Sequence, residues 1–464
     1  MLPRLGASLN RAFPPQPPLE RRTRATLLAL VALGAVARVA WVLVAAERPE
    51  GLRDPGLYLI LGEMIADGNG YAYPGEAGGV TAYYPPGYPL TLGAVGWLAG
   101  LLPVGLSLFG VAIAVNVVLS VATIAIVFEL GRRLVGAAVG LVAAGIMALW
   151  PNLVFHTGVI LTETLFLFLL VLMLLVALAT PEVARAPGPW RMLATGVLLG
   201  MVGMVRPTSF VVAPVLLILW WPAGLTTVVR RAALVGGAAL LVVVPWTVRN
   251  AVRMDSVVLI STNMGDNLCM GHHPGATGVY SFADDHFCFM GLQSGERPEF
   301  EIERQSETLD RAFTHMREDP AQIVGLMPAK LRYTLDSDAD GLRAATDYGD
   351  HTLFGDNAMD LLRWSANAYY ALVGMLGIGG AALLLLRPDA TRRRLFLVVV
   401  GVVQLVPPLL TFGDPRFKMP LYPTLAICAA VAVVAMAHRR MPDPDGERAG
   451  EAASDRSALE RVPV

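Results

Sequence analysis

Charged residues are scarce in this sequence. Only 16% of its 464 residues are Asp, Glu, Lys or Arg, whereas 55% are hydrophobic. This balance excludes a disordered chain, and it is poor in charge for an ordinary soluble domain. The composition therefore predicts a membrane protein, with the lipid bilayer as its first partner.

A surplus of basic residues is also missing. The sequence has 36 Lys and Arg against 37 Asp and Glu, which gives a formal net charge of -1. Proteins that bind nucleic acids need many Lys and Arg side chains to neutralise phosphates. We therefore expect no nucleic-acid partner.

Cysteine is rare, with three residues in the chain. Cys428 lies in an apolar run and is interpreted as a small core residue. Cys269 and Cys288 share one long polar segment, where a disulfide is one of two open alternatives. It would require that this segment face an oxidising compartment.

Ten apolar runs are long enough, or nearly long enough, to cross a membrane. They lie at residues 26–46, 107–130, 134–150, 163–180, 192–205, 208–221, 232–247, 365–386, 395–412 and 417–437. With the N-terminus inside, most Arg pairs fall on the cytoplasmic side, as the positive-inside rule requires. An eleventh run, 90–102, is interpreted as a short or re-entrant helix on the outer side.

These runs predict an all-α polytopic membrane protein, a bundle of about 10–11 transmembrane helices with two outer loops. The expected parts are a cytoplasmic tail (1–25), an N-terminal transmembrane module (26–247, with outer loop 47–87), an acidic outer domain (248–364), C-terminal transmembrane helices (365–437) and a disordered cytoplasmic tail (438–464). The expected location is the plasma (inner) membrane, with both termini in the cytoplasm.

The segment 251–364 holds 19 of the 37 acidic residues and five of the seven His. The two outer loops are long while most other connections are short, so we expect the chemistry to take place outside.

Asp54 follows the first predicted span within a few residues and stands before Pro55. A carboxylate held beside the membrane surface can act as a general base on a hydroxyl. An Asp before a Pro at the first helical position is also a common helix cap. Both interpretations stay open, and they do not exclude each other.

The same loop ends in Tyr83-Tyr84-Pro85-Pro86-Gly87-Tyr88-Pro89. Its prolines and glycine fix an extended turn beside three phenol rings. Such rings either anchor the chain at the membrane interface or stack against a sugar or an isoprenoid chain.

Glu163 stands at the outer end of a span, where a carboxylate needs a partner, a water-filled cavity or a helix N-terminus. Arg206 joins two predicted spans of 14 residues each, so the joint should lie below the membrane surface. Its guanidinium either faces a cavity that holds an anion or extends to the interface.

Further cations occur at outer span ends, as Arg249-Asn250 and as Arg416. Cations beside two carboxylates are what a phosphate leaving group and a base require. Asn267 lies in a segment polar enough for sugar contacts. His272 and His273 are adjacent, which is a poor spacing for a metal site.

Several motifs in this order resemble the family 39 type of GT-C glycosyltransferase, similar to protein O-mannosyltransferases and to the lipid A aminoarabinose transferase. They are Asp54 with Tyr58, Gly68-x-Gly70-Tyr71, Tyr84-Pro85-Pro86-Gly87-Tyr88-Pro89, Thr162-Glu163-Thr164, Pro245-Trp246-Thr247-Val248-Arg249-Asn250, Gly265-Asp266-Asn267-Leu268 with Gly271, and Arg416-Phe417 before Pro420. The resemblance covers most of residues 26–437.

The resemblance implies a hexosyl- or pentosyltransferase with a polyprenyl-phosphate sugar donor, an acceptor hydroxyl that enters from outside, and inversion at the anomeric carbon. It implies that Asp54 is the catalytic base and that Glu163 is a second acid near the donor. The remaining predicted site residues are Arg206, Arg249 and Arg416 for the donor phosphate, and Tyr58, Tyr84, Tyr88, Asn250, Asn267 and His272 for the substrate.

The aminoarabinose transferase has a metal-binding Glu just before its Pro, where this chain has Tyr84 or Pro85. We therefore predict no cofactor and no requirement for a divalent metal. The alternative function is a transporter or flippase of lipid-linked sugars. Inverted repeats would favour it, and none is visible in the sequence.

Overall fold

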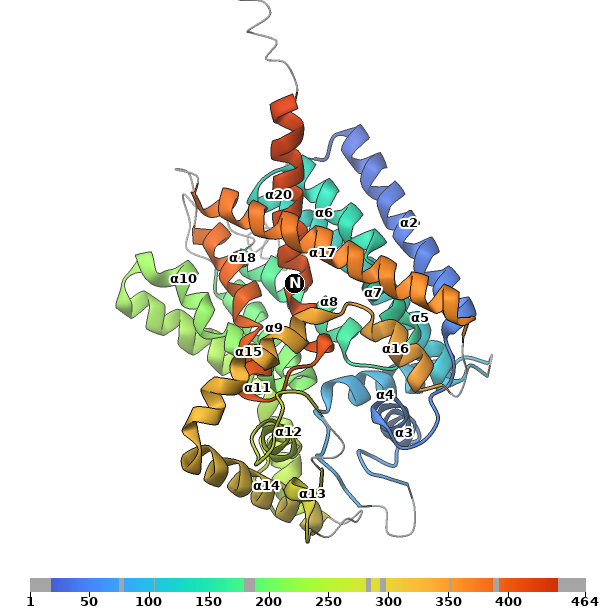
Figure 1. Cartoon of the computed structure of the whole chain (residues 1–464), viewed down its shortest axis with the longest axis vertical. Coiled ribbons are helices and arrows are strands. Elements are labelled where there is room, and N and C mark those ends of the chain that lie inside the picture. The colour runs from blue at the N-terminus through green and yellow to red at the C-terminus, as the bar shows by residue number, and fades with distance from the viewer. Residues whose placement is uncertain are drawn as a thin grey trace, which may run out of the picture.

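The structure is a computed structural model that describes residues 18–74, 79–103, 105–178, 188–280, 285–292, 298–349, 353–386 and 392–440. Helices make up the architecture (Figure 1). The described residues contain no β-strand, and their isolated bridges join Ala72 to Val80 and Val279 to Gly413. The predicted all-α fold is confirmed.

The N-terminal half consists of helices of very different length. In chain order they are α2 (Arg21–Ala45), α3 (Asp54–Ala66), α4 (Gly87–Gly100), α5 (Leu108–Leu134), α6 (Ala137–Leu149), α7 (Pro151–Phe155), the 3₁₀ helix η1 (His156–Gly158), α8 (Glu163–Leu178), α9 (Pro189–Val205), η2 (Pro207–Val212), η3 (Pro214–Leu216), α10 (Leu217–Trp220), η4 (Trp221–Ala223) and α11 (Leu225–Met254).

The C-terminal half also consists of helices of mixed length. They are α12 (Met264–Gly271), α13 (Asp285–Phe289), α14 (Pro298–Glu318), α15 (Pro320–Asp336), α16 (Asp340–Asp347), α17 (Asp356–Leu386), α18 (Arg392–Val403), α19 (Val406–Leu410), η6 (Pro415–Leu421) and α20 (Tyr422–Arg440).

Six helical segments in the described part of the chain are long and apolar enough to cross a membrane. They are Arg21–Ala45, Leu108–Leu134, Leu225–Met254, Asp356–Leu386, Arg392–Leu410 and Pro415–Ala437. A seventh arises if α6 and Pro151–Gly158, bent by 57°, form one broken span. The protein is therefore a multi-pass membrane protein.

This count of six or seven is lower than the 10–11 expected, because three predicted spans are short. Glu163–Leu178, Pro189–Val205 and Pro207–Ala223 are apolar but have fewer than 18 residues. Prolines divide the last of them into 3₁₀ pieces, since each removes a backbone donor. α4 covers the run 90–102 and, with 14 residues, is also too short to cross alone.

Two helices extend beyond the predicted boundaries, because apolar runs mark only the part of a helix that lies in hydrocarbon. α11 continues through Pro245 to Met254, past the expected start of the outer domain at residue 248. α17 begins at Asp356, nine residues before the predicted span at 365. Of the predicted tails, residues 1–17 and 441–464 lie outside the described residues.

Two buried arginines cap helix ends inside the bundle. Arg38 of α2 donates to the carbonyl oxygens of Ala148 (3.0 Å) and Met147 (3.1 Å), in the last turn of α6. Arg191 of α9 donates to those of Val176 and Ala177 at 2.6 Å, in the last turn of α8. The carbonyls of a last helical turn lack partners within the helix, and cations there are stabilising.

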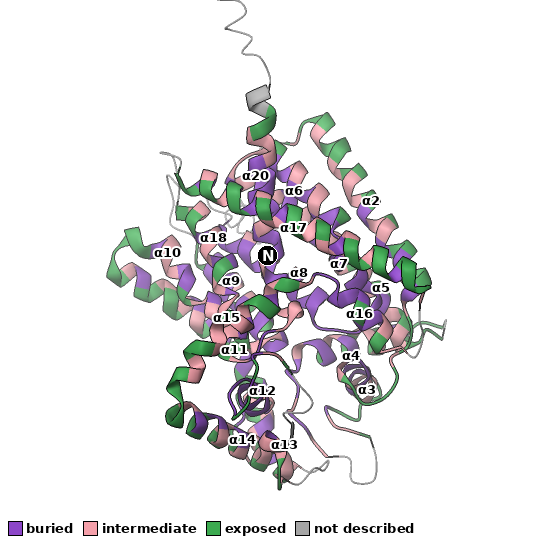
Figure 2. Cartoon of the chain, viewed as in Figure 1, coloured by how far each residue is buried: buried purple, intermediate pink, exposed green. Residues whose placement is uncertain are grey.

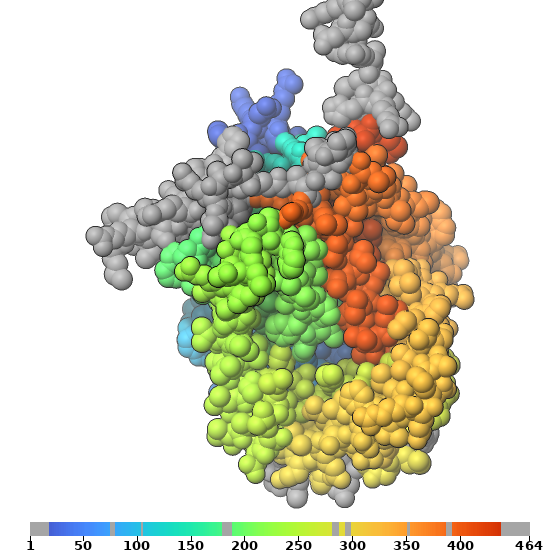
Figure 3. All heavy atoms as spheres, turned by 90° about the vertical axis from the view of Figure 1, so that its left-hand side faces the viewer, coloured from blue at the N-terminus to red at the C-terminus, as the bar shows by residue number. Residues whose placement is uncertain are grey.

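The core lies among α5, α6, α8 and the middle of α20, while α2 and α17 expose one side (Figure 2). α12 to α14 gather at the lower end of Figure 1, near α3 and α4. On the side seen in Figure 3, α14 and α15 cover the lower part of the molecule beneath α11 and α18.

The cysteine alternatives are settled by two observations. Cys269 and Cys288 form a disulfide that joins α12 to α13. Cys428 is a buried free thiol in α20. Both the disulfide and the interpretation of Cys428 as a core residue are thereby confirmed.

Candidate active site

Asp54 opens α3, but it does not cap it. The cap residue is Arg53, and no side chain accepts a hydrogen bond from this helix end. The Asp54 carboxylate instead accepts a hydrogen bond from the Tyr84 hydroxyl at 2.7 Å. Its second oxygen lies 3.5 Å from Nη1 of Arg416, and its side chain is 34% exposed. The capping interpretation is therefore wrong, and the carboxylate is held in a position that solvent and ligands can reach.

Glu163 and Arg206 form an ion pair at the start of α8. Glu163 is the first residue of that helix and is buried, and one of its oxygens accepts from Nη2 of Arg206. Nε of Arg206 donates to the Thr162 hydroxyl at 3.0 Å. The Arg206 side chain is 17% exposed. The cation at this joint thus has a buried carboxylate as its partner and keeps one exposed side.

The phenol of Tyr58 connects these groups electrostatically. Burial raises its pKa, and the carboxylates of Asp54 and Glu163 raise it further. The guanidinium groups of Arg206 and Arg416 oppose this rise. Tyr58 therefore lies within the field of all four charged side chains. We call these five residues the active-site cluster.

Arg416 is held from both sides. It follows Pro415 in η6, and the Asp414 carboxylate accepts hydrogen bonds from its backbone N–H (2.8 Å) and from Nε (3.4 Å). Its Nη1 faces Asp54, and its side chain is 20% exposed. The sequence motif therefore places a fixed guanidinium beside the candidate base.

The rings of Tyr84 and Tyr88 pack against Tyr58 at one side of this cluster. The Tyr58 ring lies 4.8 Å from the ring of Tyr84 and 5.5 Å from that of Tyr88, both edge to face. The Tyr88 side chain is buried inside the protein. The structure thus brings together three of the predicted substrate-binding residues around the acids.

A close contact between α4 and α9 explains why the Tyr-Pro-Pro-Gly run has a glycine at position 87. A Cβ at Gly87 would lie 2.7 Å from the Val205 side chain and 2.8 Å from the Met204 carbonyl oxygen. Only glycine allows α4 to approach the end of α9 this closely. That contact lies directly before Arg206, so the motif joins the tyrosine loop to the Arg206–Glu163 pair.

Tyr348 lies near the active-site cluster, although it was not predicted as a site residue from the sequence. It caps α16, and burial raises the pKa of its phenol. Arg416 lowers that pKa, while Asp54, Glu163 and Asp414 raise it, so these charges lie close by. No local signal marks a single Tyr near the end of a polar loop. Only the fold brings residue 348 to residue 54.

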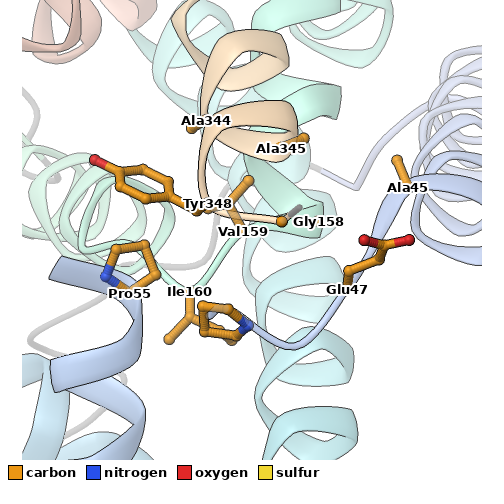
Figure 4. A pocket seen from close by; sticks show the side chains of 11 residues that line it. Ala45, Glu47, Pro55, Gly158, Val159, Ile160, Ala344, Ala345 and Tyr348 are labelled. Atoms are coloured by element: carbon orange, nitrogen blue, oxygen red, sulfur yellow. The ribbon is translucent and has the colours of Figure 1, made fainter. Parts of the chain in front are cut away.

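Tyr348 also lines a small pocket (Figure 4). It is lined by Ala45, Glu47, Pro49, Pro55, Gly158, Val159, Ile160, Ala344, Ala345, Tyr348 and Gly349. The Glu50 N–H donates to the Tyr348 carbonyl at 3.1 Å. The end of the second outer loop is therefore attached to the first one.

Arg249 and Asn250 lie apart from the cluster. Arg249 donates to the carbonyl oxygens of Thr81 (2.7 Å) and Tyr71 (2.6 Å) and covers the Trp246 ring. Asn250 is buried and donates to the Val258 carbonyl at 3.0 Å. Both side chains hold backbone of the outer loops.

Asn267 and His272 also lie elsewhere, in and after α12. Asn267 donates to the Asn263 carbonyl at 2.9 Å. His272 is buried, with Nε2 at 3.0 Å from Nζ of Lys330 and 2.9 Å from the Leu410 carbonyl oxygen. Burial and the Lys330 charge lower the pKa of His272 to about 4. These contacts give His272 a packed environment rather than a substrate surface.

Metal ligands are not assembled in the part of the chain that the structure describes. No group there has three or more His, Cys, Asp or Glu side chains placed to hold an ion. In the active-site cluster, Asp54 and Glu163 each face a guanidinium instead. Independence of metal stays a prediction.

Three comparisons relate the chain to known proteins. Residues 95–248 match the family described as dolichyl-phosphate-mannose-protein mannosyltransferase. That match includes Glu163 and Arg206 but not Asp54 or Arg416. No curated protein matches the chain in sequence.

Solved structures of one archaeal enzyme share the fold. The archaeal oligosaccharyltransferase AglB from Archaeoglobus fulgidus, in complex with an inhibitory peptide and a dolichol-phosphate, matches with a TM-score of 0.54 and 15% identity over 90% of this chain and 51% of that one. The same enzyme tethered with an acceptor peptide matches with a TM-score of 0.54 and 14% identity, over 90% of this chain and 50% of that one. ArnT from Cupriavidus metallidurans bound to undecaprenyl phosphate has a TM-score of 0.43 and 18% identity, over 87% of this chain and 77% of that one.

The chain thus spans about half the length of the oligosaccharyltransferase structures that it matches. The resemblance to GT-C glycosyltransferases seen in the sequence motifs is confirmed by the family match and by the fold.

Proposed function

From this fold and this site we propose that the chain is an integral membrane glycosyltransferase. It transfers a sugar from a polyprenyl-phosphate donor to an acceptor hydroxyl on the outer face of the membrane. The observation that carries the proposal is a partly exposed carboxylate, Asp54, oriented by Tyr84 and set 3.5 Å from the fixed guanidinium of Arg416. A base and a phosphate-binding cation are the two groups that this reaction needs.

In the proposed step, Asp54 takes the proton of the acceptor hydroxyl while the acceptor oxygen forms a bond to the anomeric carbon. The bond from that carbon to the donor phosphate oxygen breaks, and its electron pair stays on the phosphate. Because the acceptor attacks from the face opposite the leaving group, the anomeric configuration inverts.

Arg416 and Arg206 are the proposed phosphate ligands. Negative charge grows on the departing phosphate, and guanidinium groups fixed in advance stabilise it without reorganisation. Both side chains are partly exposed, at 20% and 17%. Glu163 is buried against Arg206, so its proposed role is to hold that cation rather than to move a proton. Arg249 is left out of this step, because its guanidinium already binds backbone carbonyls.

The dolichol-phosphate in the AglB complex and the description of the family matched by residues 95–248 support a polyprenyl-phosphate donor. The disulfide between Cys269 and Cys288 supports an outer position for the second loop, since disulfides persist in oxidising compartments. We therefore place the site outside the plasma (inner) membrane, with both termini in the cytoplasm.

The test is transfer of label from radiolabelled polyprenyl-phosphate sugars in membranes that carry the chain, with and without chelator. A panel of hexose and pentose donors is compared for wild type, Asp54→Asn and Glu63→Gln. Glu63 lies in the same helix and pairs with Arg48 on the surface, so it is a matched control. Transfer by wild type and Glu63→Gln but not by Asp54→Asn is the expected result.

Other outcomes contradict the proposal in distinct ways. Equal transfer by Asp54→Asn would exclude this carboxylate as the base. Label that crosses the bilayer without transfer, whether or not Asp54 is present, would identify a transporter of lipid-linked sugars instead. Loss of transfer in chelator alone would show that a metal takes part.

A further inference from the structure

A second group of charged side chains lies in the interior, and the proposed reaction does not use it. Its members come from the break after α6, from the start of α16 and from η6 and α20. They are Trp150, Asn152, His156, Asp338, Asp340, Lys418 and Tyr422, which we call the buried network.

Asp338 is the centre of one half of the network. Its carboxylate accepts from Nε1 of Trp150 at 2.8 Å and from the Tyr422 hydroxyl. Nζ of Lys418 lies 3.4 Å from the same carboxylate. The backbone N–H of Asp338 donates to the Asn367 side chain at 2.6 Å, so the residue is held at both ends.

Asp340 is the centre of the other half. Its oxygens lie 2.7 Å from Nε2 of His156 and 2.7 Å from Nδ2 of Asn152. The Gly341 N–H donates to the other atom of that amide, Oδ1, at 2.9 Å. The start of α16 is therefore bound to the broken segment after α6.

Burial makes this network costly. The side chains of Asp338 and Lys418 are both 0% exposed, and those of His156 and Asp340 are 1% exposed. Taking such charges out of water costs several kcal/mol per ion, and apolar residues of similar size are often as stable or more so. The network is therefore not explained by stability alone, and its position in the chain suggests another use.

Lys418 links the network to the active-site cluster. It stands two residues after Arg416, and its Nζ donates to the carbonyl oxygens of Pro415 (3.1 Å) and Ser337. The ammonium thus bends back over the turn that presents Arg416, while Asp338 holds it from the opposite side. A second link runs from His156 of the buried network, which interacts electrostatically with Glu163 of the active-site cluster.

We propose that Asp338 is a positioning residue for the transfer reaction, which acts by holding Lys418 and thereby the Pro415–Arg416 turn, so that the Arg416 guanidinium faces Asp54 and the donor phosphate. This inference rests on the proposed function. Small displacements of a catalytic group far from the mutated residue can cost about 100-fold in rate. Asp338→Asn should therefore lower kcat by roughly 10- to 100-fold.

The first experiment separates positioning from stability with Asp338→Asn, Lys418→Met and the double variant. Either single change leaves a buried charge without its opposite charge, so both should lower the thermal midpoint in detergent. The double variant removes both charges and should regain the midpoint. If Asp338 positions Arg416, kcat stays low in the double variant. Recovery of kcat together with the midpoint would show a purely structural role and overturn the inference.

The second experiment asks whether the effect passes through Arg416. Asp338→Asn is combined with Arg416→Lys, and kcat and the donor KM are measured for each. We expect less than about a twofold further loss of kcat in the Arg416→Lys background, since coupled residues are not additive. The same 10- to 100-fold loss in both backgrounds would contradict the inference. Asp336→Asn, two residues away and exposed, is the control that should match wild type.

Failure of the proposed function and failure of the positioning role give different results. If wild type transfers no sugar from any donor, the proposed function fails. If wild type transfers sugar in an Asp54-dependent way and Asp338→Asn matches it, only the positioning role fails.

Discussion

The active-site cluster and the buried network use the same chemistry in opposite surroundings. Each contains two carboxylates that face two basic side chains, Arg206 and Arg416 in one and His156 and Lys418 in the other. In the cluster Asp54 is 34% exposed, whereas the network is sealed. The comparison indicates that exposure, rather than residue type, separates groups available for reaction from groups that hold the chain.

The strongest test of this difference is Asp54→Asn. We expect sugar transfer to fall by about 1,000-fold, since a positioned base contributes 10²- to 10⁴-fold. The thermal midpoint should change little, because Asp54 and Arg416 are both partly exposed and lie 3.5 Å apart, and such pairs contribute little to stability. Transfer assays and thermal unfolding in detergent measure the two effects. A large drop in the midpoint would show that Asp54 holds the fold instead.

Asp340→Ala should give the reverse pattern. Removing one partner of a buried ion pair leaves His156 without its carboxylate and Asn152 with only its longer contacts to Asp338 and Tyr422, and such a loss typically costs about 3–5 kcal/mol. We expect a marked loss of folded protein and of thermal midpoint, compared with Asp336→Asn. A variant that unfolds like wild type would contradict the view that the sealed network is structural.

His272 and Lys330 form a third buried group, in which two basic side chains face each other instead of facing carboxylates. Burial lowers the pKa of Lys330 to about 8 and that of His272 to about 4. Each group therefore binds fewer protons when folded, so stability should rise with pH from about 4 to 6.5 and again from about 8 to 10.5. Each window contributes at most about 1.4 kcal/mol per pH unit.

Thermal midpoints recorded across these pH values measure this dependence. His272→Gln should flatten the lower window and leave the upper one unchanged. An unchanged slope between pH 4 and 6.5 would show that His272 is not the titrating group.

The smallest effect is expected for Tyr84→Phe. This change removes the hydrogen bond to Asp54 but keeps the ring contact with Tyr58. A single hydrogen bond to a charged group contributes about 1.5–3 kcal/mol when buried, and less at a partly exposed carboxylate. We expect roughly a three- to tenfold lower kcat with an unchanged donor KM. A loss as large as that of Asp54→Asn would give the phenol itself a role in proton transfer.

Local patterns predicted much of this fold. Apolar runs located the long helices, and charged residues at or near the ends of these runs singled out Asp54, Glu163, Arg206 and Arg416, whose charges the fold brings together. Helix ends were less predictable, because α11 and α17 extend as polar helices beyond their apolar runs. Prolines turned the run 208–221 into short 3₁₀ pieces that its hydropathy does not reveal.

The partners of these residues were beyond sequence reasoning. Arg249 and Arg416 look alike in the sequence, since each lies within a few residues after a proline, near a predicted outer span end. Only the fold directs one to backbone carbonyls and the other to Asp54. Tyr348 and Asp338 carry no local signal either, because they meet distant parts of the chain. Asp338 accepts from Trp150 and Tyr422, 188 and 84 positions away, and the Tyr348 carbonyl accepts from Glu50.

The arginine that caps the end of α6 has a consequence for how the protein is made. Arg38 enters the membrane with the first span, but its acceptor at Ala148 follows 110 residues later. At about 5–20 residues per second, a ribosome needs roughly 5 to 20 s to supply that carbonyl. Until then the Arg38 guanidinium has only the Gly34 carbonyl of its own helix and, later, the Ser120 hydroxyl as partners. We therefore expect the first helix to stay beside the insertion machinery and to join the lipid only after α6 arrives.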